Sequence, residues 1–429
     1  MTNSVGLKKI CIIGAGPLGL SAAYYLSQAN KNNIDITIFE ASSTVGGLAA
    51  SHKLENGQCI ESYYHHIFCS DTSFISLCVE IGLDPNLFFK ATSIGHYFNG
   101  KLYSIGAPLD ILAGNLLSPL NRLRFLLASI FLKTGIRKIF NGETALNGCY
   151  KLYGSQCTRR IWYPLLEGKF NNYKALVPMS WLAARIRDRS LKLGYLNGGF
   201  ELFYARLLSI CASRGVSFCY NTRVKSVTLD SGRVFINDVE YDACLSSIGP
   251  VNEAKLNFPD PSKSIKYLGA ICVVFEIQDD PGLPYWTNYC DPKSPVLAVI
   301  SHRELDDSDR YGDCYPVYSA AYVAPDSDLF NLSDSEIKTL FLGPIQAISL
   351  LADCPRPVRY SCATIYRTKY AQPVINPDVG LPPVIDTAGP LYRASMHSIY
   401  PNDRGQNYAI EIGKRMANII SRDICSQQL

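Results

Sequence analysis

The sequence predicts an α/β protein in which one parallel sheet is assembled from separate stretches of the chain. A strand–helix–strand pattern opens the sequence, the same alternation returns over residues 196–255, and a helix follows residue 405. A helical, arginine-bearing region and a β-rich region lie between these stretches. We therefore expect a discontinuous α/β domain with an inserted α+β domain.

Length and composition exclude several classes of protein. The chain has 429 residues, 47% of them hydrophobic, which is enough for two or three packed domains, and no apolar run is long enough for a transmembrane helix. The net charge of +4 is carried by dispersed basic residues, which argues against a nucleic-acid partner. The 15 cysteines lie in predicted core segments without metal-ligand spacing, so we expect a reduced, cytoplasmic protein with no metal site.

The opening strand runs into a glycine motif. Lys9–Ile13 is apolar, and Gly14, Gly16 and Gly19 then form G-x-G-x-x-G at the start of a helical pattern. The first glycine makes the turn, the second lets a pyrophosphate approach the backbone, and the third lets helix and strand pack closely. Glu40 ends the next strand, where a carboxylate can bind a ribose hydroxyl. These features predict a Rossmann-like dinucleotide site.

A second glycine pair favours FAD over NAD. Gly46 and Gly47 follow Glu40 closely, so another stretch of backbone can reach the pyrophosphate and ribityl chain of an extended cofactor. An ordinary Gly-Gly turn is the alternative. The residues expected to hold FAD in these turns are Gly14, Gly16, Pro17, Leu18, Gly19, Glu40, Ala41, Gly46, Gly47 and Leu48.

Residues 10–51 resemble the flavin-containing amine oxidoreductase superfamily. The chain is most similar to bacterial protoporphyrinogen-oxidase-like, NAD(P)/FAD-dependent oxidoreductases, over residues 64–71, 164–170, 193–200 and 399–409. The segment 64–71 is also similar to UDP-galactopyranose mutases. The resemblance implies a Rossmann-like (GR2-type) FAD-binding domain made of residues 1–90, 196–255 and 376–429. The implied substrate region comprises a helical part, 91–195, and a sheet, 256–375.

The resemblance also implies further FAD contacts. The backbone of Val224, in a strand expected over Arg223–Leu229, would pair with the adenine, and Gly249 would pass near the pyrophosphate. The helix after residue 405 would direct its first amides at the N1 and O2 edge of the flavin. Its contact residues are expected to be Arg404, Gly405, Asn407 and Tyr408.

Candidate catalytic residues are His66, Tyr370 and Arg367. The resemblance to the mutases places His66 beside the isoalloxazine, where an imidazole could tune the ring or act as acid or base. A structural role for His66 remains the alternative. Tyr370 lies in a stretch that often covers the flavin in the superfamily, and Arg367 belongs to the same stretch.

Basic residues of the helical region form a candidate substrate site. Guanidinium groups match carboxylate and diphosphate oxygens, although Asp188 and Glu167 could pair with the same cations. The candidates are Arg160, Lys169, Arg185 and Arg189.

The apolar stretch Leu116–Lys133 is either a membrane-surface helix, which would make the protein membrane-peripheral, or a buried helix.

We expect an FAD-dependent oxidoreductase that moves a hydride from a small organic molecule to flavin N5. One alternative is a redox-neutral flavoenzyme of the mutase type that acts on a nucleotide- or lipid-linked sugar. Another is a non-catalytic flavin-binding redox sensor. The strand Tyr267–Phe275 lacks the lysine that many amine oxidases carry, which argues against simple amine oxidation.

Overall fold

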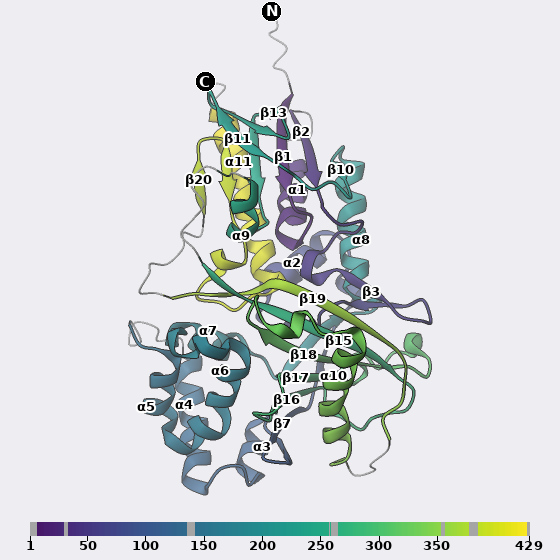
Figure 1. Ribbon diagram of the computed structural model, residues 1–429. Coiled ribbons are helices and arrows are strands. Elements are labelled where there is room, and N and C mark those ends of the chain that lie inside the picture. The colour runs from purple at the N-terminus through teal and green to yellow at the C-terminus, as the bar shows by residue number, and fades with distance from the viewer. Residues whose placement is uncertain are drawn as a thin grey trace, which may run out of the picture.

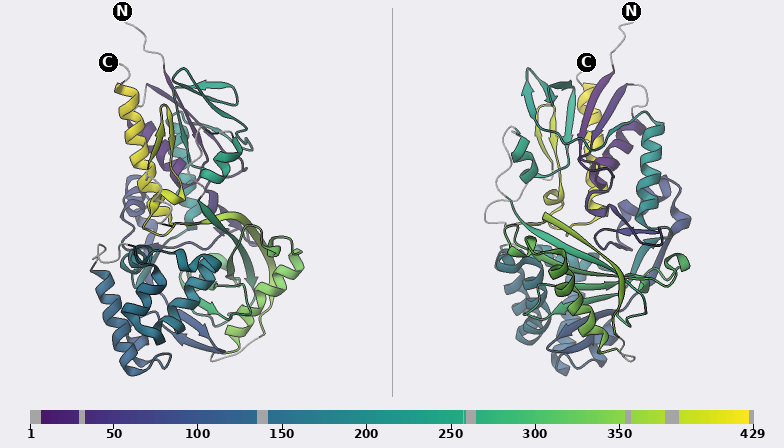
Figure 2. Two further views of the ribbon diagram at one scale, coloured as in Figure 1. Left: turned by 60° about the vertical axis from the view of Figure 1, so that its left-hand side comes forward. Right: turned by 45° about the vertical axis from the view of Figure 1, so that its right-hand side comes forward.

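The fold stacks a parallel sheet with its helices over a larger mixed sheet (Figure 1). The computed structural model describes residues 7–29, 33–134, 142–256, 258, 265–352, 357–376 and 385–426. The described parts of the chain begin and end at the outer end of the parallel-sheet half in all three views (Figures 1 and 2).

The parallel sheet joins strands that are far apart in the sequence. Its strand order is β10 (Ser217–Cys219), β2 (Ile34–Phe39), β1 (Lys8–Ile13), β14 (Ala243–Ser246), β21 (Leu391–Arg393) and β20 (Asp386–Ala388). All neighbouring pairs are parallel except β20–β21. The apolar β1 is central, with β2 on one side and β14 on the other, as a fully buried parallel strand requires.

Each face of this sheet is covered. On one side lie α1 (Pro17–Ala29), α8 (Gly199–Ser213) and α11 (Gln406–Ser426), with α2 (Thr72–Glu80) against α11. Helices α1 and α11 approach closely, because a Cβ at Gly413 would lie 2.1 Å from the Ser21 hydroxyl. On the other side lies an antiparallel meander, β11 (Val227–Asp230), β12 (Arg233–Ile236) and β13 (Val239–Tyr241).

The larger sheet is mixed. Its order is β19 (Tyr360–Val374), β15 (Lys266–Ile277), β18 (Tyr315–Val323), β17 (Ala298–Ser301), β16 (Trp286–Cys290), β7 (Ile94–Phe98) and β8 (Lys101–Ser104). One face packs on α10 (Asp334–Ser349) through alternate side chains of β15 such as Ile271, Val273 and Phe275. The opposite face, with Ala270 and Cys272, belongs to the core shared with the parallel sheet.

Helices form a separate layer beside this sheet (Figure 2). They are α3 (Pro108–Ala113), α4 (Pro119–Lys133), α5 (Ala145–Cys157), α6 (Tyr163–Phe170) and α7 (Met179–Asp188), with a π-helical turn (Thr158–Trp162) before α6. The region expected to be helical from residue 91 therefore begins with strands instead. Ile94–Phe98 pairs in parallel with β16 and connects it to the edge strand β8, and Tyr97 and Phe98 pack on the two opposite faces of the mixed sheet.

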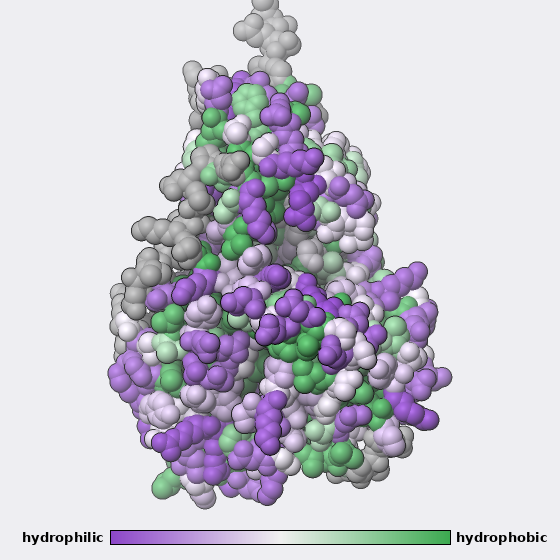
Figure 3. All heavy atoms as spheres, in the orientation of Figure 1, coloured by the Kyte–Doolittle hydropathy of each residue, from purple (hydrophilic) through white to green (hydrophobic). Residues whose placement is uncertain are grey.

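Short pairings link the two halves of the molecule. A hairpin of β3 (Ser51–Lys53) and β4 (Cys59–Glu61) and a small sheet of β5 (Ile67–Phe68), β9 (Lys192–Leu196) and β6 (Leu87–Ala91) lie between the large sheets. A short helix α9 (Pro250–Glu253) follows β14. Hydrophilic side chains cover much of the face in Figure 3. In the described part of the chain, no helix combines the length and apolar character needed to cross a bilayer.

Candidate functional site

The three glycines between β1 and α1 have the separate geometries that a dinucleotide turn requires. Gly14 has a φ of +99°, and a Cβ there would lie 2.6 Å from the Ser247 hydroxyl. A Cβ at Gly19 would lie 2.0 Å from the carbonyl oxygen of Gly14, so helix and strand meet only without a side chain. At Gly16, a Cβ would meet no described atom within 4 Å. The middle glycine therefore faces open space beside the start of α1, where Pro17 and Leu18 form its first turn.

The second glycine pair lies directly against the first turn. Gly46 and Gly47 have φ values of +107° and +57°, and the amide of Gly46 donates to the Ala15 carbonyl at 2.9 Å. A Cβ at Gly47 would lie 3.5 Å from the Gly16 Cα. The two glycine segments thus form one backbone-lined cradle, and Leu48 continues from it in a short helical turn.

Glu40 occupies the end of β2 next to this cradle. Its carboxylate accepts from the Ala15 amide at 2.8 Å and from the Ser42 amide, also at 2.8 Å. Ala41, between Glu40 and Ser42 in the sequence, is exposed. The carboxylate is therefore fixed beside the glycine turn, where a ribose hydroxyl can also reach it.

Two further predicted cofactor residues border the parallel sheet. Gly249 follows β14 with a φ of +80°, and a Cβ there would lie 3.2 Å from the Ser395 hydroxyl. Val224 lies in an extended segment rather than in a strand, because β11 begins only at Val227. The predicted strand start is wrong because the Asn237 side chain accepts from the amides of residues 225 and 226, which removes them from the ladder.

The start of α11 connects the cradle with the mixed sheet. The side-chain oxygen of Asn407 accepts from the amides of Ser73 and Phe74 at the start of α2, at 2.9 and 3.1 Å. The hydroxyl of Tyr408 donates to Asp188. These side chains position α11 against its neighbours, and the exposed Gly405 precedes its first turn.

A buried cluster of charges precedes α11. Asp403 accepts from the Lys169 ammonium at 2.7 Å and forms an ion pair with Arg185, and these cations hold the pKa of its carboxyl well below the usual range. Arg404, the next residue, donates to the hydroxyl of Tyr322 on β18. The cluster therefore joins α6, α7, β18 and the segment before α11.

His66 lies near this cluster. Its Nδ1 is 3.0 Å from the Tyr285 hydroxyl, and burial together with Arg189 and Arg185 lowers its pKa to about 3. The imidazole is consequently neutral near pH 7. Within the described residues, the Arg189 side chain has no carboxylate at ion-pair distance, unlike Arg185.

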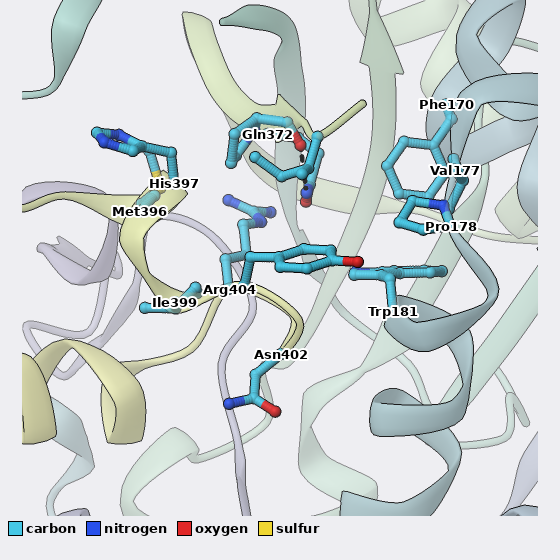
Figure 4. A pocket seen from close by; sticks show the side chains of 13 residues that line it. Phe170, Val177, Pro178, Trp181, Gln372, Met396, His397, Ile399, Asn402 and Arg404 are labelled. Carbon is cyan, nitrogen blue, oxygen red and sulfur yellow. Dashed lines mark hydrogen bonds between the residues drawn. The ribbon is translucent and has the colours of Figure 1, made fainter. Parts of the chain in front are cut away.

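A narrow cavity of about 20 Å³ borders the same cluster (Figure 4). Arg404 and Gln372 lie between the aromatic rings of Phe170 and Trp181 and the segment that carries Met396. The buried side-chain oxygen of Gln372 has no hydrogen-bond partner among the described atoms. The cavity thus offers a free acceptor beside the cation of Arg404.

Three predicted site residues lie elsewhere. Arg367 pairs with Asp334 of α10 at 2.8 Å, on the face of β19 that points away from the cluster, because neighbouring strand residues alternate in direction. Arg160 donates to the carbonyl of residue 116. Tyr370 packs edge-on against Tyr267, with the ammonium of residue 255 near its ring.

Comparison with known proteins decides the family. A family model described as flavin containing amine oxidoreductase matches residues 19–374. The chain belongs to this family. The enzymes of this family are flavin-containing oxidoreductases, and FAD is accordingly the cofactor of this chain. The glycine cradle fits this group, since it leaves open space where a pyrophosphate needs close backbone approach.

Individual relatives agree with this assignment. Coproporphyrinogen III oxidase from Staphylococcus aureus is 29% identical over 260 residues, which cover 51% of this chain and 55% of that enzyme. The chain thus spans about half the length of this relative. Among solved structures, an Exiguobacterium protein provisionally assigned as a protoporphyrinogen oxidase has a TM-score of 0.73 at 17% identity, covering 97% of this chain and 100% of that one. Reduced UDP-galactopyranose mutase has a TM-score of 0.74 at 15% identity, covering 96% and 93%.

Sequence reasoning singled out Lys169 and Arg185 but not the carboxylate that joins them. Asp403 lies within the segment 399–409 that resembles the family, so an acidic residue in that polar segment is the signal that the sequence offers. Tyr322 and Tyr285 carry no signal in the sequence, because each lies in an ordinary apolar or turn-flanking segment of the predicted sheet. Both reach the site only through the packing of the mixed sheet.

Proposed function

We propose that this enzyme oxidises a small organic substrate by passing a hydride to N5 of its FAD. The observation that carries the proposal is the continuity between the glycine cradle, the start of α11 and the buried charge cluster. Helix α11 packs on α1 beside the cradle, and its first residues adjoin Asp403 and Arg404. An FAD whose pyrophosphate lies at Gly16 would therefore extend its flavin toward this cluster.

The residues of the chain would hold and orient the reactants there. The first amides of α11 would stabilise negative charge on the reduced ring, since a helix start carries partial positive charge. His66, neutral and fixed by Tyr285, would line the substrate side. The surrounding aromatic side chains would exclude water and hold the reacting carbon close to the ring.

The cations favour a substrate that carries a carboxylate or phosphate group. Lys169 and Arg185 share Asp403, whereas Arg189 has no carboxylate at ion-pair distance within the described part of the chain. An anionic group placed near the half-buried Arg189 would gain charge-assisted hydrogen bonds. This preference is compatible with a porphyrinogen, the substrate type in the name of the S. aureus relative.

A mutase-type reaction is the second candidate. Arg185 and Arg189 lie four residues apart at the end of α7, next to His66, and guanidinium pairs suit a diphosphate. Such an enzyme would bind a UDP-sugar when its flavin is reduced. Binding of UDP-galactose to the dithionite-reduced protein by calorimetry would support this candidate, and its absence would remove it.

We further propose that α4 contacts a membrane surface, through which an apolar substrate would arrive. Its outward stripe is apolar, with side chains 54–82% exposed: Leu120, Leu123, Leu127 and Ile130. The exposed cations Arg124 and Lys133 adjoin the stripe, whereas the helix contains no acidic residue. An apolar face edged by cations matches a bilayer with anionic lipids.

The absorption spectrum of the purified protein tests the redox proposal. We expect flavin bands near about 375 and 450 nm that bleach on anaerobic dithionite addition and return in air. Turnover is then screened with coproporphyrinogen III, with flavin bleaching as the readout. A protein that stays colourless after reconstitution with FAD would refute the proposal.

A further inference from the structure

Tyr322, near the end of β18, occupies an unusual electrostatic position. Its side chain is 6% exposed and lies on the sheet face that points to the charge cluster. Its hydroxyl accepts from the Arg404 guanidinium and hydrogen-bonds with the hydroxyl of Tyr64. The Lys169 ammonium lies 5.5 Å from the centre of its ring. A phenol is thus buried between two cations.

The carboxylate of this cluster does not neutralise both cations. Asp403 is bound by Lys169 and by Arg185, while Arg404 directs its guanidinium at Tyr322 and at the carbonyl of Ala371. Asn171, directly after α6, donates to the backbone carbonyl of Tyr322 at 2.8 Å and adds no charge. The described surroundings of the phenol are therefore net positive.

Net positive surroundings stabilise a phenolate. Burial and the negative charge of Asp403 would raise the pKa of Tyr322, but Arg404 and Lys169 outweigh both and lower the pKa below the usual value of 10. Burial raises the pKa of its partner Tyr64 well above that value. Tyr322 is therefore the member of the pair that ionises first, with Tyr64 as hydrogen-bond donor to its oxygen.

The other ionisable groups near the cluster are poor proton acceptors. Burial lowers the pKa of His65 to about 4 and that of His66 to about 3, and the cations depress that of Asp403. A base with so low a pKa holds a proton weakly near neutral pH. The phenolate of Tyr322 is a stronger proton acceptor than these two imidazoles and this carboxylate.

We propose that Tyr322 is the acid–base residue of this site and takes up the proton released when the substrate is oxidised. Oxidation of a substrate unit H–C–X–H breaks a C–H bond, whose electron pair leaves with the hydrogen as hydride to the FAD oxidant. It also breaks an X–H bond, whose electrons form the new C=X bond while the proton passes to the phenolate oxygen. The proposal deepens the proposed oxidoreductase function and rests on it.

Tyrosine ionisation in the holoprotein tests this role directly. With tyrosine labelled by 13C at Cζ, we expect one resonance to move to the tyrosinate position below the pH range of the other tyrosines. Tyr322→Phe should remove that one signal from the 27 tyrosines, whereas the control Tyr150→Phe, at an exposed position on α5, should leave it in place. Lys169→Met should move the same transition to higher pH, because one neighbouring cation is lost.

The outcomes separate this inference from the redox proposal. If no tyrosine of the wild-type protein titrates early, or if the early signal survives in Tyr322→Phe, the role of Tyr322 is refuted even though the flavin bleaches normally. If Tyr322→Phe does not fold, the wild-type titration and its shift in Lys169→Met decide. A colourless protein would instead refute the proposed function, whatever the tyrosines do.

Discussion

At the scale of the residue, the glycine turn shows how absent side chains define a binding site. Gly19 is required for packing, since its Cβ would overlap the carbonyl of Gly14, whereas Gly16 has open space around the Cβ position. The fold itself therefore leaves room for a side chain at Gly16. What excludes one is the cofactor, which needs that space for its pyrophosphate.

Replacing Gly16 with valine should abolish FAD retention without unfolding the protein. The branched side chain meets no described protein atom within 4 Å of its Cβ, but it fills the path of the pyrophosphate. Flavin stoichiometry after gel filtration and far-UV circular dichroism are the measurements. Gly343→Val is the matched control, because a Cβ at Gly343 also meets nothing within 4 Å. Gly343 lies on α10, far along the chain from the cradle. A yellow Gly16→Val protein with normal flavin content would contradict the cradle assignment.

At the scale of the element, the sequence predicts best what is local. The G-x-G-x-x-G motif, the apolar strand before it and the acid after it fix β1, α1 and β2, because turn chemistry and periodicity act within about thirty residues. β7 joins the mixed sheet through a parallel pairing with β16, almost two hundred residues later, and no local pattern encodes that partner. The charge cluster is unpredictable for the same reason, since Tyr322 and Asp403 meet Lys169 only after packing.

Helix α4 illustrates an apolar pattern whose meaning depends on its surroundings. The sequence favours a buried helix over a membrane-surface helix. In the structure Ala128 and Leu132 face the core, while the apolar stripe faces outward. The double substitution Leu123→Glu/Leu127→Glu should therefore leave the fold intact and reduce sedimentation with phosphatidylglycerol vesicles at least tenfold, roughly the effect of losing two buried leucines.

The exposed pair Leu350 and Leu351, after α10, supplies the control for α4. The substitution Leu350→Glu/Leu351→Glu changes the net charge equally but lies outside the stripe, so vesicle binding should persist. Added salt should weaken wild-type binding, because Arg124 and Lys133 contribute by attraction to anionic lipid. Equal loss in both double variants would show that charge alone, and not the α4 stripe, governs binding.

At the scale of the whole molecule, Glu61 links helix α8, which covers the parallel sheet, to the mixed sheet. Its carboxyl, buried at the end of β4, accepts from the Tyr195 hydroxyl and from the amide of Phe200 at the start of α8. Its backbone carbonyl accepts from Tyr318 of the mixed sheet at 2.8 Å. Burial raises the pKa of the carboxyl to about 7, so the junction holds a proton that an exposed glutamate would have lost.

This proton makes the stability of the folded chain depend on pH in a defined window. The native carboxyl keeps its proton up to about pH 7, whereas the unfolded chain releases it near 4.5, so the native state binds more protons between these values. The free energy of unfolding therefore falls as pH rises through the window, by up to about 1.4 kcal/mol per pH unit from this group. Glu61→Gln cannot titrate, so its unfolding free energy minus that of the wild type should increase by roughly 3 kcal/mol from pH 4.5 to 7.5, measured by urea unfolding. Glu201→Gln, at an exposed position on α8, should follow the wild type, and a pH-independent difference for Glu61→Gln would show that the buried carboxyl is ionised throughout.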